Sequence, residues 1–170
     1  LDTSSILVRA TMINILLLLI INISVDDNIK KGIRKYNKGK YEDAIFEFSK
    51  VEKSKKDFEY YFYVGHSYSF AGMNEISISY YDSAYILNDK SDQLFFERGL
   101  SNFIIGESNN ALKDLDKAID INPINAKYYI NRGSIKYDLG LIESACDDWY
   151  FAISLDNKII DESIIEINCN

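Results

Sequence analysis

The stretch "RGSIKYDLG", residues 132–140, carries two glycines seven residues apart in a segment that otherwise has the character of a helix. Thirty-four residues earlier, the stretch "RGLSNFIIG", residues 98–106, has the same Arg-Gly start and the same closing glycine. Glycine inside a helix costs about 0.5–1 kcal/mol relative to alanine. Its return at a fixed interval therefore indicates that both positions have a structural purpose.

Every glycine of the chain belongs to a pair with this spacing of seven, and successive pairs begin 33, 34 and 34 residues apart. The four pairs are Gly32 and Gly39, Gly65 and Gly72, Gly99 and Gly106, and Gly133 and Gly140. A period of this length is typical of a solenoid, in which each unit buries its apolar face against its neighbours.

A small–bulky–small pattern follows each glycine pair in the same register. Its members are Ala44, Phe48 and Val51; Ser77, Tyr81 and Ala84; Ala111, Leu115 and Ala118; and Ala145, Trp149 and Ala152. Spacings of four and three place such residues on one face of a helix. Each unit is therefore predicted to be two antiparallel helices. The first glycine lets the helices approach closely, and the second ends the first helix.

With these glycine pairs, these second helices and Pro123 after the helix in "NNALKDLDKAIDINP", the chain resembles the tetratricopeptide repeat (TPR) proteins. The resemblance implies an all-α solenoid, the TPR superhelix, and a binding scaffold whose first helices line a concave groove. It covers residues 26–159, divided at about 26–57, 58–91, 92–125 and 126–159 into units one to four. Unit one departs from the family pattern with polar Asn28, Lys31 and Lys35, which suits a capping unit.

A closing helix is predicted over residues 160–170, because Ile160, Ile164 and Ile167 recur at spacings of four and three. Antiparallel packing of this helix on the last second helix would make Cys146 and Cys169 neighbours. A disulfide and two buried thiols both remain open, since sequence does not show the geometry that a bridge needs. The stretch "ACDDW" followed by a terminal cysteine also resembles the end of some exported bacterial TPR proteins.

The N-terminal residues 1–25 differ in kind from the repeat. The stretch "MINILLLLIINISV", residues 12–25, has no charge, and it is shorter than the roughly 20 residues of a membrane span. Its length matches the apolar region of a signal peptide, although no small-x-small cleavage site follows. A cleaved signal, an uncleaved membrane anchor and a buried terminal helix all remain open. We expect an exported or membrane-associated protein of the cell envelope or periplasm rather than a cytoplasmic one.

Composition argues against several functions. The net charge of −7 disfavours nucleic acid as a partner, because phosphate binding needs clustered Lys and Arg. Two cysteines and one histidine do not make a four-ligand metal site, and no glycine-rich phosphate motif predicts a cofactor. Nothing in the sequence marks a nucleophile or an orienting carboxylate beside His66, and the aspartates of the second helices are expected to be mostly solvated. We therefore expect no catalytic activity.

Residues at spacings of four and three along the first helices are candidates for the groove that the resemblance implies. Those expected to contact a protein or peptide partner are Phe62, His66, Phe96, Leu100, Phe103 and Tyr137. The Lys, Asn and Arg clamp of chaperone-binding family members is absent, since Tyr63, Gln93 and Glu97 stand in such places. An apolar, aromatic groove suits a helix or an extended peptide.

Several alternatives to this groove remain. The same aromatic residues are candidates for the core, and the groove is equally suited to the chain's own N-terminal segment or to a second copy. A structural, self-assembling subunit of a cell-envelope complex is the alternative function.

Overall fold

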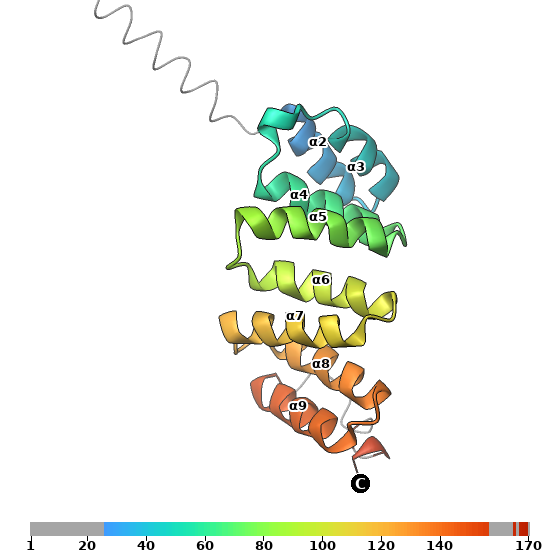
Figure 1. Ribbon diagram of the computed structural model, residues 1–170, viewed down its shortest axis with the longest axis vertical. Coiled ribbons are helices and arrows are strands. Elements are labelled where there is room, and N and C mark those ends of the chain that lie inside the picture. The colour runs from blue at the N-terminus through green and yellow to red at the C-terminus, as the bar shows by residue number, and fades with distance from the viewer. Residues whose placement is uncertain (1–25, 157–164, 166, 170) are drawn as a thin grey trace, which may run out of the picture.

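The computed structural model describes residues 26–156, 165 and 167–169, and the predictions for residues 1–25 lie outside this part. The described residues form an all-α array of helix pairs without strands, stacked along one long axis (Figure 1). The helices are α2 (Asp27–Tyr36), α3 (Tyr41–Phe48), α4 (Phe58–Phe70), α5 (Asn74–Leu87), α6 (Asp92–Ile104), α7 (Ser108–Ile121), α8 (Ala126–Asp138) and α9 (Ile142–Leu155), with a 3-10 turn η1 (Lys53–Lys55). Among the residues described, none of the helices combines the length and the hydrophobicity that crossing a bilayer requires.

The first helix of every pair begins at a residue whose side chain accepts a hydrogen bond from the backbone of the first turn. The capping residues are Asp26, Asp57, Ser91 and Asn125. Such a cap satisfies an amide that the helix leaves unpaired, and it contributes about 1 kcal/mol. The start of each first helix is thus encoded locally, eight residues before the first glycine in units two to four and six residues before it in unit one.

The two glycines of each pair have the different purposes that the sequence predicts. Gly140, just after α8, has a φ of 78°, which favours glycine over other residues. Gly133 lies where α8 meets α9, and a Cβ there would be 2.6 Å from Trp149 Nε1 and 3.0 Å from the Ala145 carbonyl oxygen. The first glycine therefore permits close packing, and the second allows the turn.

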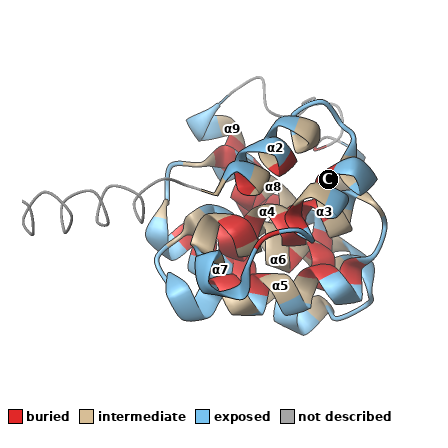
Figure 2. Cartoon of the chain, turned by 90° about the horizontal axis from the view of Figure 1, so that it is seen from above, coloured by how far each residue is buried: buried red, intermediate tan, exposed pale blue. Residues whose placement is uncertain are grey.

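The small–bulky–small residues form the interior of the array. All twelve are buried, and nine of them, including Ala44, Ser77 and Ala111, have no solvent-exposed surface. Each second helix packs against its own first helix, and α3, α5 and α7 also pack against the first helix of the next unit. Seen down the long axis, α4, α6 and α8 lie toward the middle, and α3, α5, α7 and α9 are arranged around them (Figure 2). The first helices thus form an inner layer.

The C-terminal residues are attached to the last helix pair by a disulfide between Cys146 and Cys169, with their Cα atoms 5.8 Å apart. The Tyr137 hydroxyl donates a hydrogen bond to Asn168 Oδ1 at 2.7 Å, and Ile165 is buried beside Cys146. The prediction that Ile167 would face the array is wrong, because it is 78% exposed. Residues 168 and 169 are fixed to the array, so the residue one turn earlier, Ile165, faces inward. Residues 160 and 164 lie outside the described part.

Candidate binding face

Two of the predicted groove residues, Phe62 and His66 on α4, lie in the interior of the array. Phe62 is 6% exposed and packs with Tyr81 and Leu94, which belong to the next two helices. His66 is also 6% exposed, and its ring centroid is 5.4 Å from that of Phe62. The expectation that both contact a partner is therefore corrected, because both rings are packed between neighbouring helices.

Two further predicted residues are used by contacts within the array. The Phe96 ring lies 4.9 Å from that of Tyr128 on the next first helix. Tyr137 packs 5.5 Å from the ring of Trp149 and lies under the C-terminal residues through its bond to Asn168. Leu100 and Phe103, both on α6, are half-buried and retain exposed surface.

Equivalent positions of α4 and α6 form two parallel stripes on the inner layer. Along α4 the stripe is Tyr63, His66 and Phe70; along α6, thirty-four residues later, it is Glu97, Leu100 and Ile104. Spacings of three and four place each set on one helix face. Phe70 is 54% exposed and Ile104 is 63% exposed. Along α8 the corresponding residues are Asn131, Ser134 and Asp138, so the apolar surface ends at unit three.

Tyr36, at the end of α2, is the centre of an aromatic cluster on this face. Its ring centroid lies 5.4 Å from that of Tyr63, 5.0 Å from His66 and 6.1 Å from Phe70. The Tyr41 ring lies 5.7 Å from Tyr36 and stacks on Phe70 at 4.9 Å. Edge-on and tilted arrangements of this kind add to the energy of burial. The cluster joins unit one to unit two.

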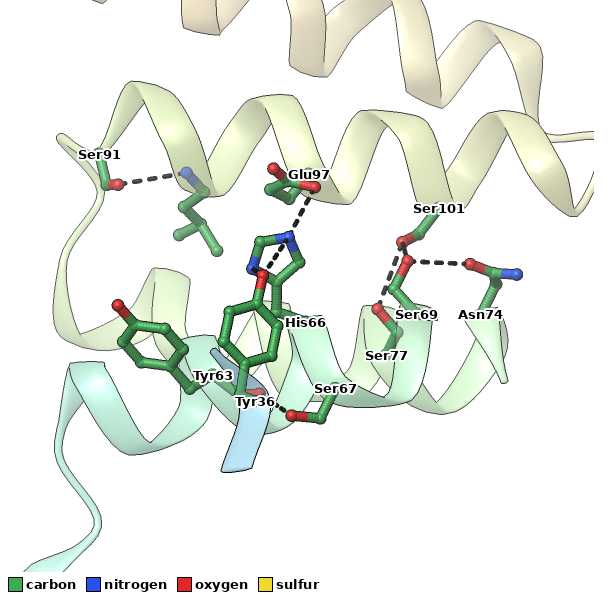
Figure 3. Close-up of polar contacts among 11 residues, drawn as sticks. Tyr36, Tyr63, His66, Ser67, Ser69, Asn74, Ser77, Ser91, Glu97 and Ser101 are labelled. Atoms are coloured by element: carbon green, nitrogen blue, oxygen red, sulfur yellow. Dashed lines mark hydrogen bonds and ion pairs between the residues drawn. The ribbon is translucent and has the colours of Figure 1, made fainter. Parts of the chain in front are cut away.

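A chain of hydrogen bonds links three first helices through His66 (Figure 3). Nε2 of His66 lies 3.1 Å from Glu97 Oε2, and Nδ1 lies 3.0 Å from the Tyr36 hydroxyl oxygen. When the Nε2–H group donates a hydrogen bond to the carboxylate, Nδ1 accepts one from the tyrosine hydroxyl. The expectation that no carboxylate lies beside His66 is corrected, because Glu97 comes from the next unit.

This arrangement has the composition of a catalytic triad but not its electrostatics. Burial raises the pKa of Tyr36 to about 12, and the charge of Glu97 adds to that effect. An activated nucleophile needs a lowered pKa or a base that removes its proton readily. A hydroxyl that holds its proton more tightly than usual is suited to hydrogen bonding rather than to attack.

A second polar chain, made of serine hydroxyls, lies between α4, α5 and α6 (Figure 3). Ser101 Oγ is 3.2 Å from Ser77 Oγ and 3.3 Å from Ser69 Oγ, and the Ser69 hydroxyl donates to Asn74 Oδ1 at 3.3 Å. Ser77 and Ser101 have no exposed surface. Because buried hydroxyls must be paired, this chain fixes how unit three sits on unit two.

The opposite side of α6 carries an ion pair that the sequence analysis missed. Arg98 donates to both carboxylate oxygens of Asp114, at 2.9 and 2.7 Å, and to Asp82 at 2.8 Å. Asp114 is 6% exposed, so the expectation that it would be solvated is corrected. A usable signal existed in the sequence: Asp82 and Asp114 lie sixteen residues before and after Arg98.

The same ion pair recurs one unit later. Arg132 donates to Asp148 at 2.9 and 2.6 Å and to Asp116 at 2.7 Å, and Lys136 adds a contact with Asp148 at 2.8 Å. The hydrogen bonds to Asp148 raise the pKa of Arg132 above its ordinary value, against the effect of burial. Each arginine therefore joins two successive second helices through one first helix.

Solved structures share this architecture. The array superposes on YrrB, described as a TPR protein with an unusual peptide-binding site, with a TM-score of 0.69, 17% identity and coverage of 81% of this chain and 70% of that one. The described residues therefore have the TPR fold. A crystal structure of MamA matches this chain with a TM-score of 0.72, 25% identity and coverage of 81% of this chain and 78% of that one.

The TPR domain of Arabidopsis OM64 also matches this chain, with a TM-score of 0.61 and 21% identity over 65% of this chain and 91% of that domain. No protein-family model matches the sequence, and no curated protein matches it either. The TPR assignment therefore rests on the repeat and on the solved structures.

Proposed function

We propose that this TPR protein is a non-catalytic scaffold that binds a peptide or helix of a protein partner on the inner face of units two and three. The observation that carries the proposal is the pair of stripes on α4 and α6. Phe70 and Ile104 are both more than half exposed, and they lie together on this one face. An apolar surface of this kind marks an interaction site.

The chemistry of the face suits a partner with apolar side chains. Phe70 and Ile104 lie at equivalent positions of neighbouring helices, with half-buried Leu100 and Phe103 beside them. Burial of apolar surface gains about 25 cal/mol per Å², and aromatic residues tend to dominate interface energies. The peptide-binding site ascribed to YrrB supports the same use of this fold.

Capture of partners from the native host, with purified protein as bait, tests this proposal through matched variants. Phe70→Ser and Ile104→Ser remove exposed side chains from the face, and we expect each to weaken capture about tenfold. Ile86→Ser is the control, because Ile86 is 81% exposed on the outer helix α5. Equal loss with the control, or no loss with the two face variants, would place the binding surface elsewhere.

Self-assembly, the alternative function, has its own measurement. We expect sedimentation of the purified array to show a monomer over a wide range of concentration. A concentration-dependent oligomer that the Ile104→Ser change abolishes would assign the face to a second copy of the chain instead of to a partner.

We also propose that the protein is exported or attached to a membrane through residues 12–25. The uncharged stretch and the disulfide support this proposal, because disulfides persist mainly in oxidising compartments. Fractionation of the native host is the measurement. Full-length chain in the cytosolic supernatant, with residues 12–25 intact, would contradict it.

A further inference from the structure

Glu97 on α6 is a largely buried carboxylate with little charge compensation. Its side chain is 16% exposed, and in the described part of the chain His66 is the only residue that pairs with it. Asp114 on α7, which meets the other side of α6, has a comparable side-chain exposure of 9% but is held by two hydrogen bonds from Arg98. A buried carboxylate is costly without a cation, so Glu97 is a position where a cation from outside would be stabilised.

The rings beside Glu97 add to its attraction for a cation. Tyr36 lies at the centre, with Tyr63 and Phe70 within 6.1 Å of its ring centroid, and Glu97 is joined to Tyr36 through His66. Ring faces are negative, so a Lys or Arg side chain gains energy on them. Tyr36 and Tyr63 are half-buried and Phe70 is 54% exposed, so the rings are accessible from solvent.

The charge of the whole chain favours the same kind of ligand. The net charge is −7, and a basic partner segment would be attracted over a distance. The apolar stems of Lys and Arg also suit an apolar stripe, because these side chains bury their methylene groups and keep only the head group polar. Glu97 is the acidic residue of the α4 and α6 stripes.

We infer that Glu97 and the rings of Tyr36, Tyr63 and Phe70 bind one Lys or Arg side chain of the partner. This inference rests on the proposed function and adds the chemical class of the anchor residue. The cationic head group contacts the Glu97 carboxylate, and the stem lies against the rings. The apolar side chains of the partner then continue along Leu100 and Ile104.

The single histidine of the chain makes this testable by NMR, since every imidazole signal belongs to His66. The full protein is titrated with N-acetyl-Leu-Arg-Leu-amide and, separately, with the same tripeptide carrying citrulline. Citrulline has the shape of arginine without its charge. We expect the arginine peptide to shift the His66 signals at concentrations about tenfold below those that the citrulline peptide needs.

Two variants locate the effect. Glu97→Gln keeps the shape of the side chain, and we expect it to weaken the arginine peptide about tenfold. Glu75→Gln is the control, because Glu75 is exposed on α5, and binding should be unchanged. No shift with the arginine peptide, equal binding of both peptides, or full binding by Glu97→Gln would overturn the inference. A partner still lost on Ile104→Ser in any of these cases would leave the proposed function standing.

Discussion

The same two repeat positions are filled by opposite chemistry in unit two and in units three and four. In units three and four they hold the buried pairs Arg98–Asp114 and Arg132–Asp148. Thirty-four residues before the first pair they hold Val64, which is 2% exposed, and Tyr80, which stacks on Tyr68 at 5.4 Å. The helices pack in the same way around both. The glycines and small residues recur in every unit, whereas these two positions accept either an ion pair or apolar groups.

The ion pairs and the apolar contacts respond differently to the loss of one side chain. A buried ion pair contributes little beyond the cost of removing its charges from water, but losing one partner leaves an uncompensated charge. An apolar contact loses only the area and volume that are removed. We therefore expect single substitutions to lower the unfolding free energy more at the ion pairs of units three and four than at the apolar contact of unit two.

The largest expected effect is at Asp148. Asp148→Ala leaves Arg132 and Lys136 facing each other without their shared carboxylate, and we expect a loss of about 3–5 kcal/mol in unfolding free energy. Urea unfolding followed by circular dichroism measures it. Asp147→Ala is the matched control at an exposed position, where about 0.5 kcal/mol or less is expected. Similar losses at both positions would show that the buried ion pair of Asp148 has no special weight.

Reduction of the disulfide has the next largest expected effect, and it acts on the last of the units with ion pairs. Cys146 and Cys169 are 23 residues apart, and opening a loop of this size costs about 3 kcal/mol in the chain-entropy model. Thermal unfolding with and without reductant shows the difference. The chain has only these two cysteines, so the reductant acts at one site. An unchanged melting temperature would contradict the prediction.

A smaller loss of unfolding free energy is expected from Val64→Ala, at the position in unit two that corresponds to Arg98 and Arg132. Removing two methyl groups from a buried valine should cost about 2 kcal/mol. The loss should be the same at low and at high salt, because no charge is involved. Urea unfolding at two salt concentrations measures the loss. A salt-dependent loss would show that charges also act on the packing of Val64.

The smallest effect concerns Tyr36 and alkaline pH. Tyr36→Phe removes the hydrogen bond to His66 at a cost of about 1 kcal/mol. The pKa of Tyr36 is raised from 10.0 to about 12 by burial, with Glu97 adding to it, so its protonated form stabilises the fold. That contribution is complete below pH 10 and is lost as pH rises through about 12.

Unfolding free energies between pH 9 and 12 measure the effect, over the range in which tyrosines ionise. Tyr36→Phe should make the decline shallower, and Tyr150→Phe is the control at a residue that is 54% exposed. Identical curves for the two variants would show that Tyr36 does not titrate in this way.

The fold could be predicted because its signals are local. Gly140 and Ala145 each act within one helix pair, and their repetition carries the information four times. The binding face was harder to predict. The contact of His66 with Glu97 depends on how two first helices lie side by side, and Phe62 fills space between units that no local pattern reveals.

Two other differences from the sequence prediction have specific physical causes. Asp114 and Asp148 are buried because each pairs with an arginine sixteen residues earlier, and that signal lies in the spacing of charges rather than of apolar residues. Ile165 faces inward instead of Ile167 because the disulfide fixes the rotation of a short segment.

The four turn glycines have a consequence for the handedness of the amino acids that the turns accept. Gly39, Gly72, Gly106 and Gly140 have φ values of 68°, 79°, 87° and 78°, in the region that a D-amino acid prefers. An L side chain would find open space at each, so the backbone conformation and not crowding favours glycine there. A D-alanine placed there by chemical synthesis would fit the turn and restrict the unfolded chain, with a gain of about 0.4–1 kcal/mol. In these turns glycine occupies the place of a mirror-image residue that ribosomes do not supply.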